Sequence, residues 1–391
     1  MGITPTALNQ KFVLYIDIKL KNSFRELLCN HIIMSSNKLI VFACAVSSVM
    51  ACPVSSVMAT DELPSMATND LPSMATDDLP SFLSFIKKFD KTYKSMDHLK
   101  ERFSIYSSNL KVIHSHNTCT ESVCLPINYT LGETFFTDFS QEEFKLYHNL
   151  QVVKSPLTAA KCSAFKSPNA KIPTSIDWRQ QNAVSPVKDQ GQCGSCWAFS
   201  STGSMEGAWS IATGNLISLS EQQLVDCSYG LKYGNLGCNG GEMDAAFQYA
   251  IDSGMCGEDD YTYAAKKGEC HSCSCSALVH FKSCVDVTPN NEANLAQAVA
   301  MNPVSVAIEA DTQVFQLYKS GVITSSACGT SLDHGVLVVG YGAENGIDYW
   351  LVKNSWGEGW GEDGYVKIEK TSSTNSKGVC GIAMQPSYPV V

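Results

Sequence analysis

Cysteine is the residue whose abundance most restricts how this chain can fold. The sequence has 17 cysteines among 391 residues. Disulfides persist in oxidising compartments, whereas cytosolic proteins keep their thiols reduced. We therefore expect a secreted or vesicular protein held by disulfides. The hydrophobic content of 44% is sufficient for a large buried core, and the net charge of −10 argues against nucleic acid or anionic membrane surfaces as partners.

The N-terminal region changes character twice. Residues 1–33 follow no recognisable pattern and are an unexplained extension, with Met34 as the candidate start. A lysine, a short apolar run and small residues then predict a signal peptide over 34–51. A membrane anchor is the alternative, because 39–59 contain no charge. Pro53 and four serines oppose it, so we expect no membrane association once the signal is removed.

An octad repeat and a helix follow. Residues 44–83 repeat an eight-residue unit, and its later copies, with proline and paired acids, predict an extended linker over 52–80. Apolar residues at steps of three and four then predict a helix. These residues are Leu99, Phe103, Tyr106, Leu110 and Ile113. The polar, proline-containing stretch 139–171 predicts a domain boundary, and the apolar runs 304–308 and 335–339 predict buried strands.

One cysteine has the setting of a nucleophile. Cys196 follows Gly-Ser, precedes Trp, and begins a proline-free stretch that predicts a helix over 196–212. The positive end of the helix dipole favours a thiolate, which is the nucleophilic form of cysteine. For any single cysteine, half of a disulfide is the alternative interpretation.

A thiol nucleophile needs a proton acceptor. Residues 172–391 contain three histidines: His271, His280 and His334. His334 begins an apolar run 138 residues after Cys196, and a Cys-Gly-Ser-Cys-Trp segment with a histidine at about that distance is typical of papain and the cathepsins. Asn354, at a predicted strand end, has an amide that could orient the imidazole.

Residues 80–391 resemble the papain family of cysteine peptidases, in its cathepsin L-like branch. The motifs that carry the resemblance are Ile-Pro-Thr-Ser-Ile-Asp-Trp-Arg (172–179), Ser-Pro-Val-Lys-Asp-Gln-Gly (185–191), Leu-Ser-Glu-Gln-Gln-Leu-Val-Asp-Cys (219–227), Gly-Cys-Asn-Gly-Gly (237–241), Tyr-Trp-Leu-Val-Lys-Asn-Ser-Trp-Gly (349–357) and Ser-Tyr-Pro (387–389). The resemblance implies an α+β fold with a helical left domain, a β-barrel-like right domain and a cleft between them, preceded by a helical propeptide.

The resemblance also implies a role for each site residue. Cys196 would attack the scissile carbonyl, and His334 would form an ion pair with it and later protonate the leaving amine. Asn354 would hold the His334 ring and Trp356 would shield that contact from water. The Gln190 side chain and the Cys196 N–H would stabilise the oxyanion.

Substrate positions follow from the same resemblance. The second residue before the scissile bond (P2) would enter an apolar pocket, and its backbone would meet two glycines. The implied residues are Gly240, Gly241, Met243, Ala307, Leu332 and, at the pocket floor, Gln385. We expect an endopeptidase, because segment 228–237 is short and lacks the histidine with which exopeptidase relatives close one end of the cleft, and because no retained propeptide strand is indicated.

The expected partners are protein and peptide substrates and the chain's own propeptide, with no metal or organic cofactor. We expect a monomer in the secretory pathway, either extracellular or in a lysosome- or vacuole-like compartment. The alternative is a catalytically silent binding or structural paralogue. Such a paralogue would typically have lost Cys196, His334 or Gln190, and all three are present.

Residues 172–391 contain ten cysteines besides Cys196, an even number, as five bridges would require. The resemblance implies the pairs Cys193–Cys238, Cys227–Cys270 and Cys328–Cys380, although Cys273 could equally serve Cys227. The remaining cysteines are Cys256, Cys273, Cys275 and Cys284. They could form two further bridges or, with His271, a zinc site; an oxidising compartment favours disulfides.

The predicted helix also resembles family propeptides. Its spaced signature is carried by Arg102, Tyr106, Asn109, Ile113 and Asn117, with His98 where the family has glutamate, and Gly-x-Thr-x-Phe-x-Asp (132–138) resembles a second propeptide motif. The sequence thus predicts an inhibitory propeptide over 81–171 and a mature peptidase over 172–391.

Charge suggests how the propeptide would be released. Residues 172–391 have 11 basic and 23 acidic side chains, a net charge of −12, so the preceding part carries +2. These opposite charges attract the propeptide to the peptidase near neutral pH, and protonation of carboxylates at acid pH would weaken that attraction.

Asn128, in the one N-x-Ser/Thr sequon of the chain, is the predicted glycosylation site.

Overall fold

The computed structural model describes residues 77–119, 128–148, 162–168, 170–271, 279–324 and 327–391. All of them belong to one compact unit, Ser55–Val391. The predicted extension, the signal peptide and nearly all of the linker lie outside the described residues, as do Cys273 and Cys275. Within the described part, no helix has both the length and the apolar character needed to cross a bilayer.

Two helices of the pro-region pack through an aromatic core. They are α2 (Leu79–Lys88) and α3 (Met96–Asn117). The α3 side chains of Phe103 and Tyr106 lie 5.2 and 5.1 Å from the Phe82 ring of α2, measured between ring centroids. This confirms the helix that the apolar spacing predicts, with its stripe turned toward α2 except at the half-exposed Ile113.

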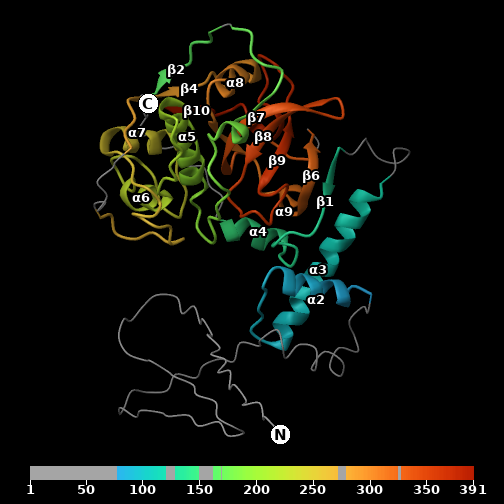
Figure 1. The fold of residues 1–391 in the computed structure, drawn as a ribbon. Coiled ribbons are helices and arrows are strands. Elements are labelled where there is room, and N and C mark those ends of the chain that lie inside the picture. Colours follow the sequence, from blue (N-terminus) through green and yellow to red (C-terminus); the bar gives the residue numbers. More distant parts are fainter. Residues whose placement is uncertain (1–76, 120–127, 149–161, 169, 272–278, 325–326) are drawn as a thin grey trace, which may run out of the picture. The chain divides into compact units, whose positions relative to one another are not determined.

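The rest of the pro-region joins the catalytic part. Strand β1 (Tyr129–Leu131) pairs antiparallel with β6 (Tyr318–Ile323), so the pro-region adds an edge strand to the main sheet (Figure 1). Helix α4 (Gln141–His148) follows and contacts α9 (Gln313–Leu317).

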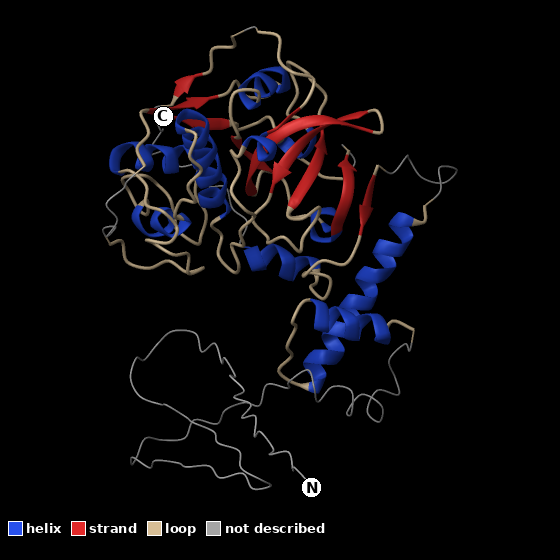
Figure 2. Cartoon of the chain, viewed as in Figure 1, coloured by secondary structure: helices blue, strands red, loops and turns tan. Residues whose placement is uncertain are grey.

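The central strands of the sheet lie on one side of the catalytic part and most of its longer helices on the other (Figure 2). The sheet runs in the order β1-β6-β9-β8-β7-β5-β10-β4-β2, with β3 pairing β7. Its further strands are β2 (Ser163–Ala164), β3 (Ile176–Asp177), β4 (Ser283–Asp286), β5 (Val304–Ile308), β7 (His334–Glu344), β8 (Ile347–Lys353), β9 (Tyr365–Glu369) and β10 (Ser387–Val390). The two predicted buried strands are β5 and the first half of β7, and every residue of both runs is buried.

The helices are α5 (Cys196–Thr213), α6 (Glu221–Cys227), α7 (Met243–Ser253) and α8 (Glu292–Val299), with short 3₁₀ turns at Trp178–Gln181 and Val379–Gly381. Helix α5 packs against β7 on one side and α7 on the other, so it is buried around most of its circumference. Its glycines allow this close approach: a Cβ at Gly203 would lie 2.7 Å from the Leu337 side chain.

The disulfides match the expected pattern in part. Three bonds are those that the family resemblance implied: Cys193–Cys238, Cys227–Cys270 and Cys328–Cys380. Of the candidate zinc ligands, Cys256 and Cys284 are disulfide-bonded and so are not available to a metal. Cys119 is disulfide-bonded as well.

The expectation for Cys284 is wrong. Its partner is Cys162, upstream of the predicted mature part, and not one of Cys256, Cys273 and Cys275. The reason is a strand pairing: β2 runs parallel to β4 with Ser163 opposite Val285, which brings Cys162 beside Cys284. The count of cysteines in the predicted mature part began at residue 172 and did not include Cys162, so it could not indicate this bond.

Candidate active site

Helix α5 places Cys196 in its first turn. Ser195 precedes it without a side-chain capping bond. Cys196 is fully buried and is the one free cysteine among the described residues. The pairing of the neighbouring cysteines therefore leaves this thiol available for chemistry.

Burial changes the protonation of this thiol. Loss of solvent raises the pKa of Cys196 to about 11, although a hydrogen bond from the Gly335 N–H acts in the opposite direction. In the full-length chain, burial thus acts against the helix terminus, which favours the thiolate.

His334 begins β7 and lies beside this helix start. A Cβ on the next residue, Gly335, would lie 3.2 Å from the Trp197 backbone and 3.3 Å from the carbonyl carbon of Cys196. The Nε2 atom of His334 is 2.8 Å from Asn354 Oδ1, which can only accept, so Nε2 carries the proton. Within the described residues Nδ1 has no hydrogen-bond partner. The unprotonated Nδ1 is thus the atom that can take a proton from Cys196.

The imidazole is neutral in this environment. His334 is fully buried, and desolvation lowers its pKa to about 4, with a smaller opposing effect from its hydrogen bond to Asn354. With the Cys196 pKa at about 11, both side chains are uncharged near neutral pH. Burial thus opposes charge on both members of the pair in the full-length chain.

Two further residues hold the His334 ring. Asn354 is 4% exposed and accepts from the Ser355 N–H (2.8 Å) through the same oxygen that faces His334. Trp356 stacks on the imidazole, with ring centroids 4.7 Å apart and planes at 26°. The indole thus covers one face of the His334 ring.

Gln190 is fixed by residues that sequence reasoning missed. Its Oε1 accepts from the Ser355 hydroxyl (2.7 Å), and its Nε2 donates to the Cys193 carbonyl (2.9 Å). The Tyr263 hydroxyl donates to the Gln190 carbonyl oxygen (2.8 Å) and lies 2.6 Å from the Ser195 hydroxyl. Because an amide nitrogen has two donors, one N–H of Gln190 remains for an oxyanion. Ser355 lies within a quoted motif, but nothing in the sequence indicates the contact of Tyr263.

The structure groups most of the expected P2 residues. Met243 and Ala307 belong to one buried apolar cluster, and Leu332 packs against it. Gly241 lies against the indole of Trp197, where a Cβ would come within 2.6 Å. Gly240 adopts a φ of +105°, which favours glycine.

Gln385 lines a cavity together with Met243, and three acidic residues that sequence reasoning did not consider line the same cavity. They are Glu242, Asp244 and Asp286, and the last two hydrogen-bond each other. Burial, followed by the charge of Asp244, raises the pKa of Asp286 to about 7. The cavity therefore gains negative charge as the pH rises through neutrality.

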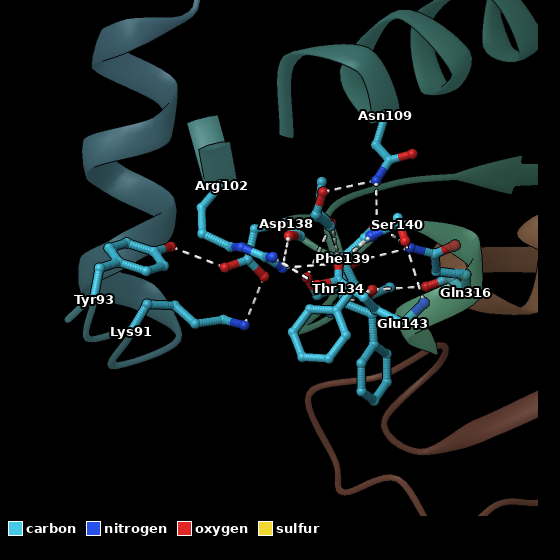
Figure 3. A network of polar contacts seen from close by, with 12 residues as sticks. Lys91, Tyr93, Arg102, Asn109, Thr134, Asp138, Phe139, Ser140, Glu143 and Gln316 are labelled. Carbon is cyan, nitrogen blue, oxygen red and sulfur yellow. Dashed lines mark hydrogen bonds and ion pairs between the residues drawn. The ribbon is translucent and has the colours of Figure 1, made fainter. Parts of the chain in front are cut away.

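The pro-region packs directly on the residue that covers the site. The rings of Phe136 and Phe144 meet Trp356 edge to face, at centroid distances of 5.9 and 5.4 Å. Gln316 Nε2 donates to the carbonyls of Phe136 (2.9 Å) and Phe139 (2.8 Å), which anchors this turn to the catalytic part. Figure 3 shows the turn and the side chains that support it.

A buried ion pair supports that turn from the pro-region side. Asp138 is 1% exposed and accepts from Lys91 Nζ (2.7 Å) and the Tyr93 hydroxyl (2.9 Å) (Figure 3). Arg102 donates to the Asp138 carbonyl (3.1 Å) and forms a two-point contact with the Glu143 carboxylate (2.8 and 2.6 Å).

Models of two protein families match the chain. The model described as papain family cysteine protease matches residues 172–390, and the model described as cathepsin propeptide inhibitor domain matches residues 82–144.

Several proteins named as cysteine proteases are similar to this chain over much of its length. Germination-specific cysteine protease 1 of Arabidopsis thaliana is 47% identical over 299 residues, covering 74% of this chain and 77% of the relative. Cysteine proteinase COT44 of Brassica napus is 45% identical over 299 residues, covering 74% and 88%. The probable cysteine protease RD21B of Arabidopsis thaliana is 48% identical over 293 residues, and the match spans 74% of this chain but only 61% of that relative.

Solved proenzymes share the fold. Digestive procathepsin L 3 of Tenebrio molitor superposes with a TM-score of 0.73 at 40% identity, covering 81% of this chain and 100% of the other. The proform of the ragweed pollen cysteine protease Amb a 11 gives 0.72 at 34% identity, covering 80% and 94%.

Proposed function

Because the chain belongs to the papain family of cysteine proteases and carries a cathepsin propeptide inhibitor domain, we propose that it is the zymogen of an endopeptidase that uses Cys196 and His334. The observation that carries the assignment is the free thiol beside an imidazole whose Nε2 is held by Asn354 and whose Nδ1 is unpartnered among the described residues. The silent-paralogue alternative gains no support, since the relatives are named cysteine proteases. Replacing Cys196 is the direct test.

The mechanism follows from these atoms. The Cys196 proton moves to His334 Nδ1, and the thiolate attacks the scissile carbonyl. The Gln190 amide and the Cys196 backbone N–H stabilise the oxyanion. The imidazolium then protonates the leaving amine, and water, deprotonated by His334, releases the acid from the acyl-enzyme. Asn354 keeps Nδ1 directed at sulfur through both proton transfers.

We propose further that the enzyme acts as a monomer in the secretory pathway, outside the cell or in a vacuole-like compartment, as its disulfides and propeptide favour. Its substrates are proteins and peptides, and its own propeptide is the inhibitor. A glycan on Asn128 would be carried by the propeptide.

Maturation at acid pH is the first expected outcome. The full-length protein should be inactive near pH 7 and, on acidification, be cleaved near Lys171–Ile172, where the catalytic family model begins. N-terminal sequencing of the acid-treated protein should begin within a few residues of Ile172. A full-length chain that is fully active at neutral pH without shortening would contradict this proposal.

Glu143 provides a physical cause for the acid step, in addition to net charge. Hydrogen bonds from Arg102 hold the Glu143 pKa below its ordinary value. A carboxylate whose folded pKa is depressed stabilises the fold above its ordinary pKa, and that stabilisation is lost as the pH falls through the folded value. Acidification thus weakens the pro-region in the direction that activation requires.

Endopeptidase action is a second expected outcome. With no histidine in segment 228–237, the end of the cleft that exopeptidase relatives close with such a residue is expected to be open. The processed enzyme should cut long peptides labelled at both ends at internal bonds, as mass spectrometry of the products would show. Release of only terminal dipeptides or single residues would contradict the assignment.

Selectivity at P2 is a third expected outcome. Met243, Ala307 and Leu332 are apolar, and burying a Leu or Phe among them contributes about 2 kcal/mol. The uncharged amide of Gln385 cannot neutralise a guanidinium, so kcat/KM for P2 Arg should fall about one to two orders of magnitude below P2 Leu at acid pH. P2 Tyr should stay close to Phe, because the Gln385 amide oxygen can accept from its hydroxyl.

The pH dependence of kcat/KM for these P2 residues tests the effect of the Asp244 and Asp286 carboxylates. Since the Asp286 pKa is about 7, the Asp244–Asp286 pair gains negative charge as the pH rises through that value. Because this charge attracts a guanidinium, the difference in kcat/KM between P2 Leu and P2 Arg should become smaller. Equal kcat/KM values for Arg and Leu at acid pH would show that the pocket is assigned wrongly.

A further inference from the structure

One disulfide crosses the proposed maturation site. Cys162 lies ten positions before Ile172, while Cys284 lies within the part that matches the catalytic family model. Their sulfurs are bonded, across a sequence separation of 122 residues. We infer that the segment carrying Cys162 remains covalently attached to the enzyme after the propeptide is cleaved. This inference rests on the proposed maturation near Ile172.

The segment around Cys162 is built into the catalytic sheet. Strand β2 pairs in parallel with β4, with Ser163 opposite Val285 and Ala164 opposite Asp286. The Phe165 N–H donates to the Asp286 carbonyl (2.8 Å), which continues the ladder by one residue. These contacts are those of a sheet edge strand and not of a covering loop.

Side-chain burial agrees with the backbone pairing. Phe165 is 9% exposed and meets Tyr388 of β10 edge to face, with ring centroids 6.5 Å apart. Cys284 is 1% exposed, so the disulfide is covered on the enzyme side. Both a covalent bond and a packed aromatic ring therefore hold this segment.

The attachment lies close to the proposed P2 cavity. The Cys162 sulfur and one carboxylate oxygen each of Asp244 and Asp286 lie within 4.8 Å of one another. Asp244 and Asp286 line the cavity that also contains Met243 and Gln385. The retained segment thus borders the region that selects substrates, which changes the earlier expectation that no propeptide strand stays behind.

The chemistry of maturation leaves this bond intact. Hydrolysis near Ile172 adds one water across one peptide bond and alters no sulfur. The product is two chains joined by Cys162–Cys284, with Pro173 after the cut still held by a hydrogen bond from the Tyr341 hydroxyl to its carbonyl (3.1 Å). Separation requires a reductant such as dithiothreitol, which supplies two electrons and two protons and yields two thiols.

Disulfide mapping of the uncleaved protein tests the bond without requiring activity. The full-length Cys196→Ala variant is treated with iodoacetamide to cap free thiols and digested without reduction. A peptide pair joining Cys162 to Cys284, which separates on reduction, is expected. Cys284 recovered alkylated, or bonded to Cys256, Cys273 or Cys275, would overturn the inference.

Cleavage of the zymogen then tests whether the segment that carries Cys162 stays attached to the enzyme. The Cys196→Ala protein is cleaved at acid pH by a trace of active enzyme from which reductant has been removed. The non-reduced product should show two N-termini, one of them near Ile172, and a mass that falls after dithiothreitol treatment. A product that begins near Ile172 and has the same mass before and after reduction would overturn the inference.

Two variants provide matched controls. Cys162→Ser should release the upstream fragment under non-reducing denaturing conditions, whereas Ser163→Ala, which removes a hydroxyl bonded to the Cys284 carbonyl (3.3 Å), should retain it. If Cys162→Ser does not fold, the mapping of the uncleaved protein still decides the question. A single N-terminus upstream of Cys162 with the bond intact would refute the cleavage position and leave the attachment supported.

Discussion

Replacement of Cys196 with alanine should lower kcat/KM for peptide hydrolysis by about four to six orders of magnitude while leaving a folded, secreted zymogen. Alanine offers no atom on which the acyl group can be carried, so the mechanism loses its first step. The fold should persist because Cys196 is unpaired and its removal breaks no disulfide. The measurement is hydrolysis of a peptide substrate by protein processed in trans, beside thermal unfolding of the zymogen.

A control on the same helix separates chemistry from folding. Ile211 lies in the last turns of α5 and is 44% exposed. The Ile211→Ala zymogen should therefore have an unchanged thermal unfolding temperature, and the processed enzyme should keep its activity. Hydrolysis that survives in Cys196→Ala and is still blocked by iodoacetamide would show that another thiol is the nucleophile.

Substitution of Asp138 with alanine should abolish the latency of the zymogen. The change leaves the Lys91 ammonium, 7% exposed, without its carboxylate, and breaking a buried pair in this way costs about 3–5 kcal/mol. Asp138 also belongs to the turn whose Phe136 ring packs on Trp356, so the loss should loosen the pro-region where it meets the site. The expected result is peptide hydrolysis near pH 7 without an acid step.

The stability part of this prediction is measured in the Cys196→Ala background, where the protein cannot digest itself. Lys145→Ala is the matched control, because the Lys145–Asp311 pair (2.8 Å) joins pro-region and enzyme at the surface, with side chains 44% and 32% exposed. Its loss should cost no more than about 1 kcal/mol. An Asp138→Ala zymogen that stays latent, or one no less stable than Lys145→Ala, would contradict the role given to the buried pair.

The sequence by itself determined the family, the α+β fold and the presence of a propeptide, since these depend on motifs that are local in the chain. Six short segments in order were enough for the catalytic part, and the apolar spacing of α3 and the uninterrupted runs of β5 and β7 were enough to locate those elements. Such signals can be recognised in the sequence alone because helical and strand periodicity involve residues that are close together in the chain.

Contacts between distant segments that no quoted motif contains were decided by the tertiary structure alone. The Cys162–Cys284 bond depends on two strands meeting across 122 residues, and the Tyr263 contact to Gln190 joins residues 73 positions apart. The protonation of Cys196 is of the same kind: the helix terminus is visible in the sequence, but the burial that raises the thiol pKa arises only when α5 and β7 pack together. Desolvation depends on every atom surrounding a group, and these atoms come from segments whose proximity no local pattern records.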